Sequence, residues 1–149
     1  MDTHTKPRSA TLKTATISYG AGKLITNDST NNTVDLSAAT EVAIGITAGD
    51  SSRTAAGVLD TAAGATVGYY PLGGVVMVQS EAAITWTLGK LVYVGASGLA
   101  TATSVGNKKL GVYVGNGETS AALGANGAGD TTNTEGTLIA VNTSSAANA

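Results

Sequence analysis

Short runs of β-branched and apolar residues alternate with turn residues along most of the chain. KLITND, NNTVDLS and EVAIGITAG follow one another between residues 23 and 49, and each ends in Asp, Ser or Gly. The second half continues with GGVVMVQS, ITWTLGKLVYVG, KKLGVYVG and GTLIAVNT. Many short strands closed by turn residues are typical of small barrels and sandwiches. The sequence therefore predicts an all-β fold, a small β-barrel or sandwich of short strands.

The segment ITWTL predicts a strand that buries one face. Ile84, Trp86 and Leu88 recur with period two, so the three bulky side chains share one side and Trp86 is expected to point inward. The following LVYV is apolar on both faces, which indicates a strand covered on both sides by the protein or by a second subunit. Trp86 and the bulky residues of LVYV and of the similar segment GVYVG are therefore predicted to lie in the core or at a subunit interface. They are Trp86, Leu91, Tyr93, Val94, Val112, Tyr113 and Val114.

A chain of 149 residues suits one domain. Residues 1–9 are expected to form a flexible polar N-terminal arm, residues 10–142 a single β domain, and residues 143–149 a disordered tail. Between the last two predicted strands, NGETSAALGANGAGDTTNTE has no hydrophobic period, and we expect a long Gly/Ala-rich loop there.

Charge indicates which partners the protein can have. The net charge of −2 argues against a nucleic-acid partner, which would need a basic face. No apolar run approaches the roughly 20 residues that cross a bilayer, so no membrane partner is expected. Positive charge is concentrated at the N-terminus, where the arm either is a solvated tail or docks on an acidic partner through Lys6, Arg8 and Lys13.

Groups that could support catalysis are scattered. The segment GAGK at residues 20–23 lacks both the earlier Gly and the following Ser or Thr of a phosphate-binding loop. His4 is the single His, the chain has no Cys, and the Asp residues are spread singly over predicted turns. We therefore expect no enzyme activity, no cofactor and no metal site.

The order of the words EVAIGITAG, GATVGYYPLGGVVMVQSEAAITWTLGKLVYVG, KKLGVYVG and GTLIAVNT resembles that of the capsid decoration (cement) proteins of tailed bacteriophages. The resemblance covers roughly residues 41–141. The chain departs from the usual family pattern at Lys90, where the family often has an acidic residue, and in its longer Gly/Ala-rich loop.

The resemblance implies a head-stabilising protein on the capsid exterior of a virion assembled in the host cytoplasm. Its partners would be the major capsid protein and itself, as a dimer or trimer. The N-terminal arm is our prediction for the coat contact, and the strands around residues 91–94 and 112–114 for the subunit contact. The alternative is a carbohydrate-binding or adhesive β-module of a fibre, which would need exposed aromatic side chains, in the first place Tyr69 and Tyr70.

Overall fold

The computed structural model describes residues 8–13, 21–28, 33–51, 55–56, 64–115 and 135–144. Within these ranges the regular structure is ten β-strands and one short 3₁₀ turn, η1 (Ala96–Gly98). The predicted all-β class is therefore confirmed.

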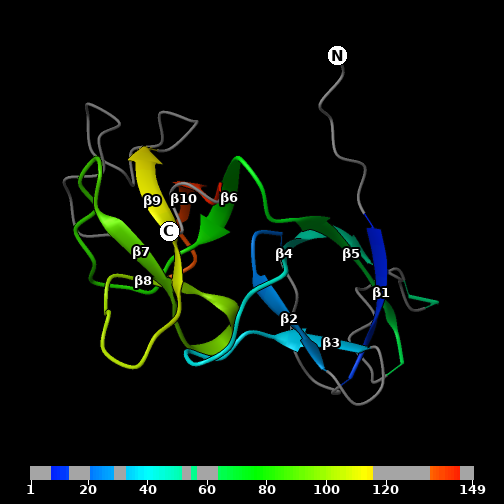
Figure 1. Cartoon of the computed structure of the whole chain (residues 1–149). Helices are drawn as coiled ribbons and strands as arrows, with labels where there is room; N and C mark the ends of the chain where they lie inside the picture. The colour runs from blue at the N-terminus through cyan, green and yellow to red at the C-terminus, as the bar shows by residue number, and fades with distance from the viewer. Residues whose placement is uncertain are drawn as a thin grey trace.

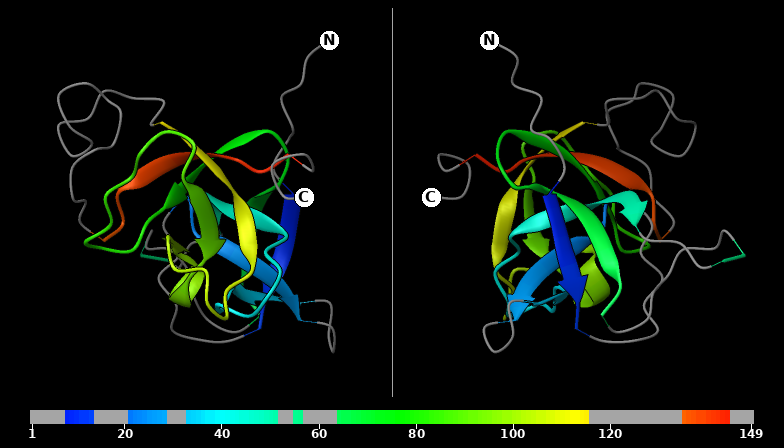
Figure 2. Two further views of the ribbon diagram at one scale, coloured as in Figure 1. Left: turned by 60° about the vertical axis from the view of Figure 1, so that its left-hand side comes forward. Right: turned by 90° about the vertical axis from the view of Figure 1, so that its right-hand side faces the viewer.

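The first five strands form a closed barrel, on the right in Figure 1. β1 and β3 pair in parallel, and the other neighbours are antiparallel. In the right-hand view of Figure 2, β1 and β5 run side by side across the near face. The barrel order is β1-β3-β2-β4-β5, made of β1 (Arg8–Leu12), β2 (Leu24–Asp28), β3 (Thr33–Leu36), β4 (Gly45–Ser51) and β5 (Thr66–Pro71).

The last five strands form a second sheet, on the left in Figure 1. All of its neighbouring strands are antiparallel. A single parallel bridge between Ser80 and Ala100 connects the end of the first edge strand to the other edge strand. The sheet order is β6-β10-β9-β7-β8, made of β6 (Val75–Gln79), β7 (Leu91–Val94), β8 (Ala100–Thr101), β9 (Lys109–Gly115) and β10 (Leu138–Asn142).

The two sheets have the same topology. If β1 to β5 are matched with β6 to β10 in chain order, every antiparallel pair of the barrel has an antiparallel counterpart in the second sheet. The parallel pair β1–β3 corresponds to the parallel bridge between Ser80 and Ala100. The chain is thus built from two copies of one five-stranded arrangement, which we call the first unit (residues 8–71) and the second unit (residues 75–144).

The correspondence extends to strand register. Leu24 lies opposite Ile46 in the first unit, and Leu91 lies opposite Val112 in the second. The same matching relates three further pairs in each unit: Ile46–Tyr70 to Val112–Asn142, Thr26–Asp35 to Tyr93–Thr101, and Thr11–Thr66 to Gln79–Leu138.

A shared Gly-Lys-Leu word begins β2 and β7. Gly22 and Gly89 have φ values of +86° and +84°, a left-handed conformation that favours glycine. Gly22 N donates to Thr47 O at 2.8 Å, and Gly89 N donates to Tyr113 O at 3.0 Å. Each glycine therefore turns the chain into a strand that pairs with the same partner strand of its own unit.

A second shared feature is close packing at two matched glycines. A Cβ atom at Gly45 would lie 2.6 Å from Tyr70 O, and one at Gly111 would clash with Asn142 O. Tyr70 and Asn142 are themselves matched positions. Both units thus need glycine where β4 or β9 approaches the last strand closely.

The units differ in closure. The barrel of the first unit is closed, whereas the second unit has only the Ser80–Ala100 bridge between β6 and β8. Backbone atoms of the first unit lie beside this incompletely paired edge. Gln79 N donates to Gly22 O at 2.8 Å, and Gly98 approaches Leu24 so closely that a Cβ atom at Gly98 would lie 2.6 Å from Leu24 O. The start of β2 therefore contacts both β6 and η1, the turn just before β8.

Two hydrophobic clusters follow from this arrangement. Leu12, Ile25, Val34, Ala65 and Val67 fill the first unit. The larger cluster, which we call the joint core, contains Leu24, Ala43 and Ile46 of the first unit together with ten residues of the second: Val76, Val78, Trp86, Val92, Val94, Ala100, Leu110, Tyr113, Ile139 and Val141. The interior of the second unit is completed by side chains of the first.

One predicted strand is absent. Residues 84–88 form no strand, and Leu88 is 65% exposed although the period of two placed it on the buried side. Trp86 points inward as predicted, and its indole Nε1 donates to the buried Ser80 Oγ at 2.9 Å. Ile84 is half-buried and packs against the joint core, so only Leu88 of the three departs from the predicted buried side. The positive φ of Ala83, +61°, and the bond from Lys90 N to Thr87 O show turns on both sides of the tryptophan. These turns prevent an extended segment.

Two predicted boundaries also differ. β1 begins at Arg8, so Arg8 and Ser9 belong to the barrel and not to the arm. Thr143, expected in the disordered tail, is buried, and it donates its backbone N–H to Gly74 O at 2.7 Å. Residues 1–7, residues 116–134 of the predicted loop, which was expected to extend to Glu135, and residues 145–149 lie outside the described residues.

The matched leucines provide a test of this architecture. Leu24→Ala should lower the free energy of unfolding by about 2–5 kcal/mol, because it removes a fully buried side chain from the joint core. Leu91→Ala, at the matched but exposed position, should cost less than about 1 kcal/mol. Urea unfolding followed by Trp86 fluorescence measures both changes, and equal costs would contradict the proposed packing.

Candidate interaction surfaces

The second unit carries a row of side chains on the face of its sheet that points away from the joint core. Leu91, Val112, Asn142 and Val75 lie opposite one another across β7, β9, β10 and β6, so they share one face. Leu91 is 42% exposed and Val75 is 61% exposed, while the two residues between them are half-buried. Three of the four are apolar.

Neighbouring positions extend this surface. Met77 lies opposite Ala140, Gln79 opposite Leu138, and Tyr93 opposite Lys109. Leu138 and Val114 are partly exposed as well. Ala140 itself is buried, and Gln79 Nε2 donates to Ala21 O of the first unit at 2.7 Å. We call the surface made by the remaining side chains the outer face: Leu91, Val112, Asn142, Val75, Met77, Leu138, Val114, Tyr93 and Lys109.

The residues predicted for the core or a subunit interface divide between two locations. Trp86, Val94 and Tyr113 belong to the joint core, where the rings of Trp86 and Tyr113 lie 5.7 Å apart. The other four are on the outer face: Leu91, Tyr93, Val112 and Val114. Strand alternation explains the division, because residues adjacent in a strand point to opposite faces.

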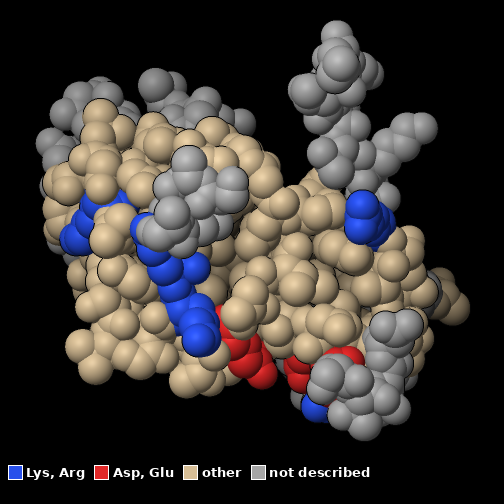
Figure 3. Space-filling view, viewed as in Figure 1, with Lys and Arg blue, Asp and Glu red and all other residues tan. Residues whose placement is uncertain are grey.

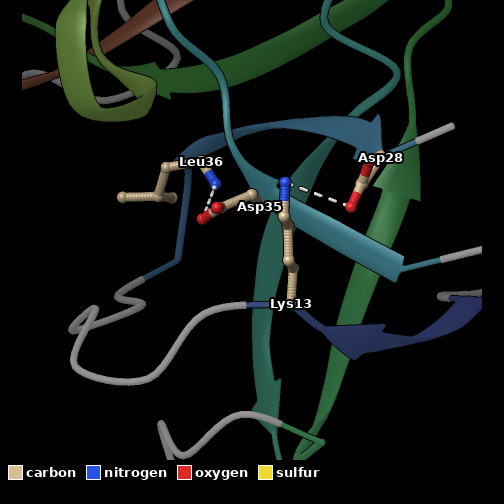
Figure 4. Close-up of polar contacts among 4 residues, drawn as sticks. All are labelled: Lys13, Asp28, Asp35 and Leu36. Carbon is tan, nitrogen blue, oxygen red and sulfur yellow. Dashed lines mark hydrogen bonds and ion pairs between the residues drawn. The ribbon is translucent and has the colours of Figure 1, made fainter. Parts of the chain in front are cut away.

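The cationic residues predicted for the arm are separated from one another. Lys6 lies outside the described residues. Arg8 is exposed at the start of β1, opposite Tyr69 of β5. Lys13 forms an ion pair with Asp28, with 3.1 Å between Nζ and Oδ2, and its side chain is 51% exposed while that of Asp28 is 13% exposed. Figure 4 shows this ion pair beside Asp35.

Several other basic side chains lie on the second unit. Figure 3 shows Lys and Arg side chains down its surface, at the left, and acidic side chains gathered along the lower edge of the molecule. Lys108 is exposed and Lys109 is half-buried at the start of β9. Lys90 donates from Nζ to Thr85 O at 2.7 Å and lies 5.8 Å from the Trp86 ring, at the margin of the joint core.

Lys23 occupies the position in the first unit that Lys90 occupies in the second. Burial lowers the pKa of Lys23 below its usual 10.5, and the negative charge of Glu135 opposes this shift. Lys23, the lysine of the first Gly-Lys-Leu sequence, is thus partly buried, and it lies near Glu135 of the second unit.

The two remaining kinds of site considered for this chain are a metal site and the tyrosines of the glycan-binding alternative. No three His, Cys, Asp or Glu side chains of that part of the chain could together hold a metal ion. Tyr69 and Tyr70 are each half-buried and pack against different hydrophobic clusters. None of the described segments is a helix long and apolar enough to cross a lipid bilayer.

The shifted pKa of Lys23 predicts a pH dependence. Between the lowered pKa of the folded state and 10.5, the unfolded chain binds more protons, so this residue makes stability rise with pH in that window. The unfolding free energy of the wild type, taken relative to that of Lys23→Gln at the same pH, should therefore increase as pH rises from 7 to 10.5. Urea titrations at several pH values measure it, with exposed Lys108→Gln as the control, and a flat difference would contradict the burial.

The sequence was also compared with known proteins. It matches no protein-family model, and no curated protein is significantly similar to it.

Proposed function

We propose that this protein is a structural protein of a virion, which binds the outside of an assembled tailed-phage capsid and stabilises contacts between coat subunits. The observation that carries this proposal is the outer face, a largely apolar sheet surface on a rigid β scaffold. A contiguous exposed apolar surface is typical of a protein-binding site. The kind of partner, a phage coat protein, is inferred from the order of short sequence segments, which resembles that of decoration proteins.

The architecture suits such a role. A closed barrel has no free strand edge to which other chains could add, and in the second unit the edge of β6 is met by Gly22 of the first unit. Many copies on one shell then stabilise it collectively, because each weak contact adds to the others.

The arm remains our prediction for the coat contact, with one adjustment from the geometry. Lys6 of the arm and Arg8 at the start of β1 would provide the positive charge of this contact, since Lys13 already faces Asp28. An arm that becomes ordered on docking loses conformational entropy in that step, so its contribution to affinity should be moderate.

The glycan-binding alternative requires aromatic side chains that lie flat on the surface. Tyr69 and Tyr70 are half-buried in the packing of the barrel and of the joint core, respectively. Because their rings are used in packing, the proposal of a structural virion protein has the stronger support.

Cosedimentation tests the proposed function. We expect the full chain to pellet with expanded, undecorated tailed-phage capsids at a saturable stoichiometry, and a deletion of residues 1–7 to bind at least tenfold more weakly. This deletion stops before β1, so the barrel is preserved. A full chain that stays in the supernatant with every capsid of a representative panel would overturn the proposal. A deletion variant with unchanged affinity would overturn only the role of the arm.

Two cations that are close in sequence should differ in effect. Arg8→Ala should weaken capsid binding severalfold more than Lys13→Ala, because Lys13 is already paired with Asp28. Lys13→Ala should also change the unfolding free energy by no more than about 1 kcal/mol, as for other half-exposed ion pairs. Binding isotherms at two salt concentrations, with thermal melts as the folding control, measure both effects. Equal losses of affinity would contradict this difference.

A further inference from the structure

Both ends of the described chain lie beside the linker that joins the two units, residues 72–74. Arg8, the first residue of β1, lies opposite Tyr69 near the end of β5, the strand that leads into the linker. On the other side, Thr143 directly follows β10 and donates its backbone N–H to Gly74 O at 2.7 Å. In both views of Figure 2 the start of β1 and the end of β10 lie in the upper part of the molecule. We call this part the linker end: Arg8, residues 72–75 and residues 142–144.

The outer face reaches the linker end. Val75 follows the linker directly and lies opposite Asn142, the last residue of β10. These two residues end the row that begins at Leu91, and Val75 is 61% exposed. The apolar row and the start of the arm, at Arg8, therefore border the same end of the molecule.

Charge is distributed unevenly between the linker end and the opposite end. Arg8 is exposed at the linker end, whereas Asp28 pairs with Lys13, which directly follows the other end of β1. β6 starts at the linker end, and Glu81 lies beyond the last residue of that strand. β10 ends there, and Glu135 lies before its first residue. Carboxylates of both units thus lie at strand ends away from the linker, and Figure 3 shows acidic side chains along the lower edge of the molecule.

We infer that the linker end is the part of the molecule that contacts the coat protein, so that the arm and the outer face bind one continuous surface of the shell. The inference rests on the proposed function and adds the orientation of the bound molecule. Its first argument is position. The arm leaves the fold at Arg8, at the same end as the exposed Val75, so one partner surface can engage both.

The second argument is charge complementarity. The positive charge of the arm requires an acidic coat surface, which attracts Arg8 and repels Asp28, Glu81 and Glu135. An orientation with the linker end toward the shell brings the cation close and keeps the carboxylates away. The partner that fits this end is therefore an apolar patch, which receives Val75, bordered by acidic side chains.

The opposite end then points away from the shell. It includes residues 102–108, the loop between β8 and β9, which Figure 1 shows at the bottom of the molecule. Val105 in this loop is 86% exposed. This valine should remain accessible on a decorated capsid, whereas Val75 should be covered.

Thiol labelling on the capsid tests this orientation. The chain has no Cys, so Val75→Cys and Val105→Cys each introduce a single thiol at an exposed valine. Each variant is treated with a maleimide, free in solution and bound to undecorated tailed-phage capsids, and labelling is followed by the mass of the chain. Binding should slow the labelling of Val75→Cys at least tenfold and leave that of Val105→Cys unchanged. Thermal melts establish that both variants are folded.

The results separate this inference from the proposed function. A protein that pellets with capsids while only Val105→Cys is protected would overturn the inference, because the molecule would then stand on its other end. Equal protection of both thiols, or protection of neither, would overturn it as well, since the contact would not be specific to the linker end. The proposed function would survive these results, because the protein is bound in each. A protein that pellets with no capsid would overturn both.

Discussion

The burial of Leu24 and Ile46 in the joint core is the constraint on which the rest of the structure depends. These two side chains belong to the outside of the first barrel, yet they pack among the interior residues of the second unit. The second unit lacks the full parallel pairing that closes the first, and the turn at Gly22 bonds to Gln79 beside that gap. The two units are therefore not independent domains, because the core of one is incomplete without the other.

Local patterns predicted the strands well. Runs such as KLITND and GTLIAVNT are strands because β-branched residues fit the pleated sheet and turn residues close each run. The segment around Trp86 was predicted wrongly, because a short period of two cannot distinguish a strand from an irregular segment that buries one large ring. The repeat of the whole unit was not predicted. Its clearest sequence signal is Gly-Lys-Leu at residues 22–24 and 89–91, and other matched positions differ as widely as Leu12 and Ser80.

The surfaces were harder to predict than the strands. Leu24 and Leu91 are the third residues of the same Gly-Lys-Leu sequence, but Leu24 is fully buried and Leu91 is 42% exposed. That difference is set by packing between segments far apart in the chain, which local sequence does not encode. The separation of Lys13 from the predicted cationic arm has a similar origin, since its partner Asp28 lies at the end of a different strand. By contrast, the predicted strand face at residues 91 and 112 could be found from its apolar character alone.

The order of the two units along the chain has a consequence for synthesis. The first barrel contains all five of its strands once Pro71 has left the ribosome, and it can close before the second unit exists. Until residues 75–142 follow, its row of Leu24, Ile46 and Tyr70 has nothing to cover it. A barrel that closes at this stage displays an uncovered apolar row on its outside. The second unit of the same chain is the nearest segment that can cover this row, because it is translated next. Folding in order along the chain therefore limits the time in which the first unit of one chain can associate with the second unit of another.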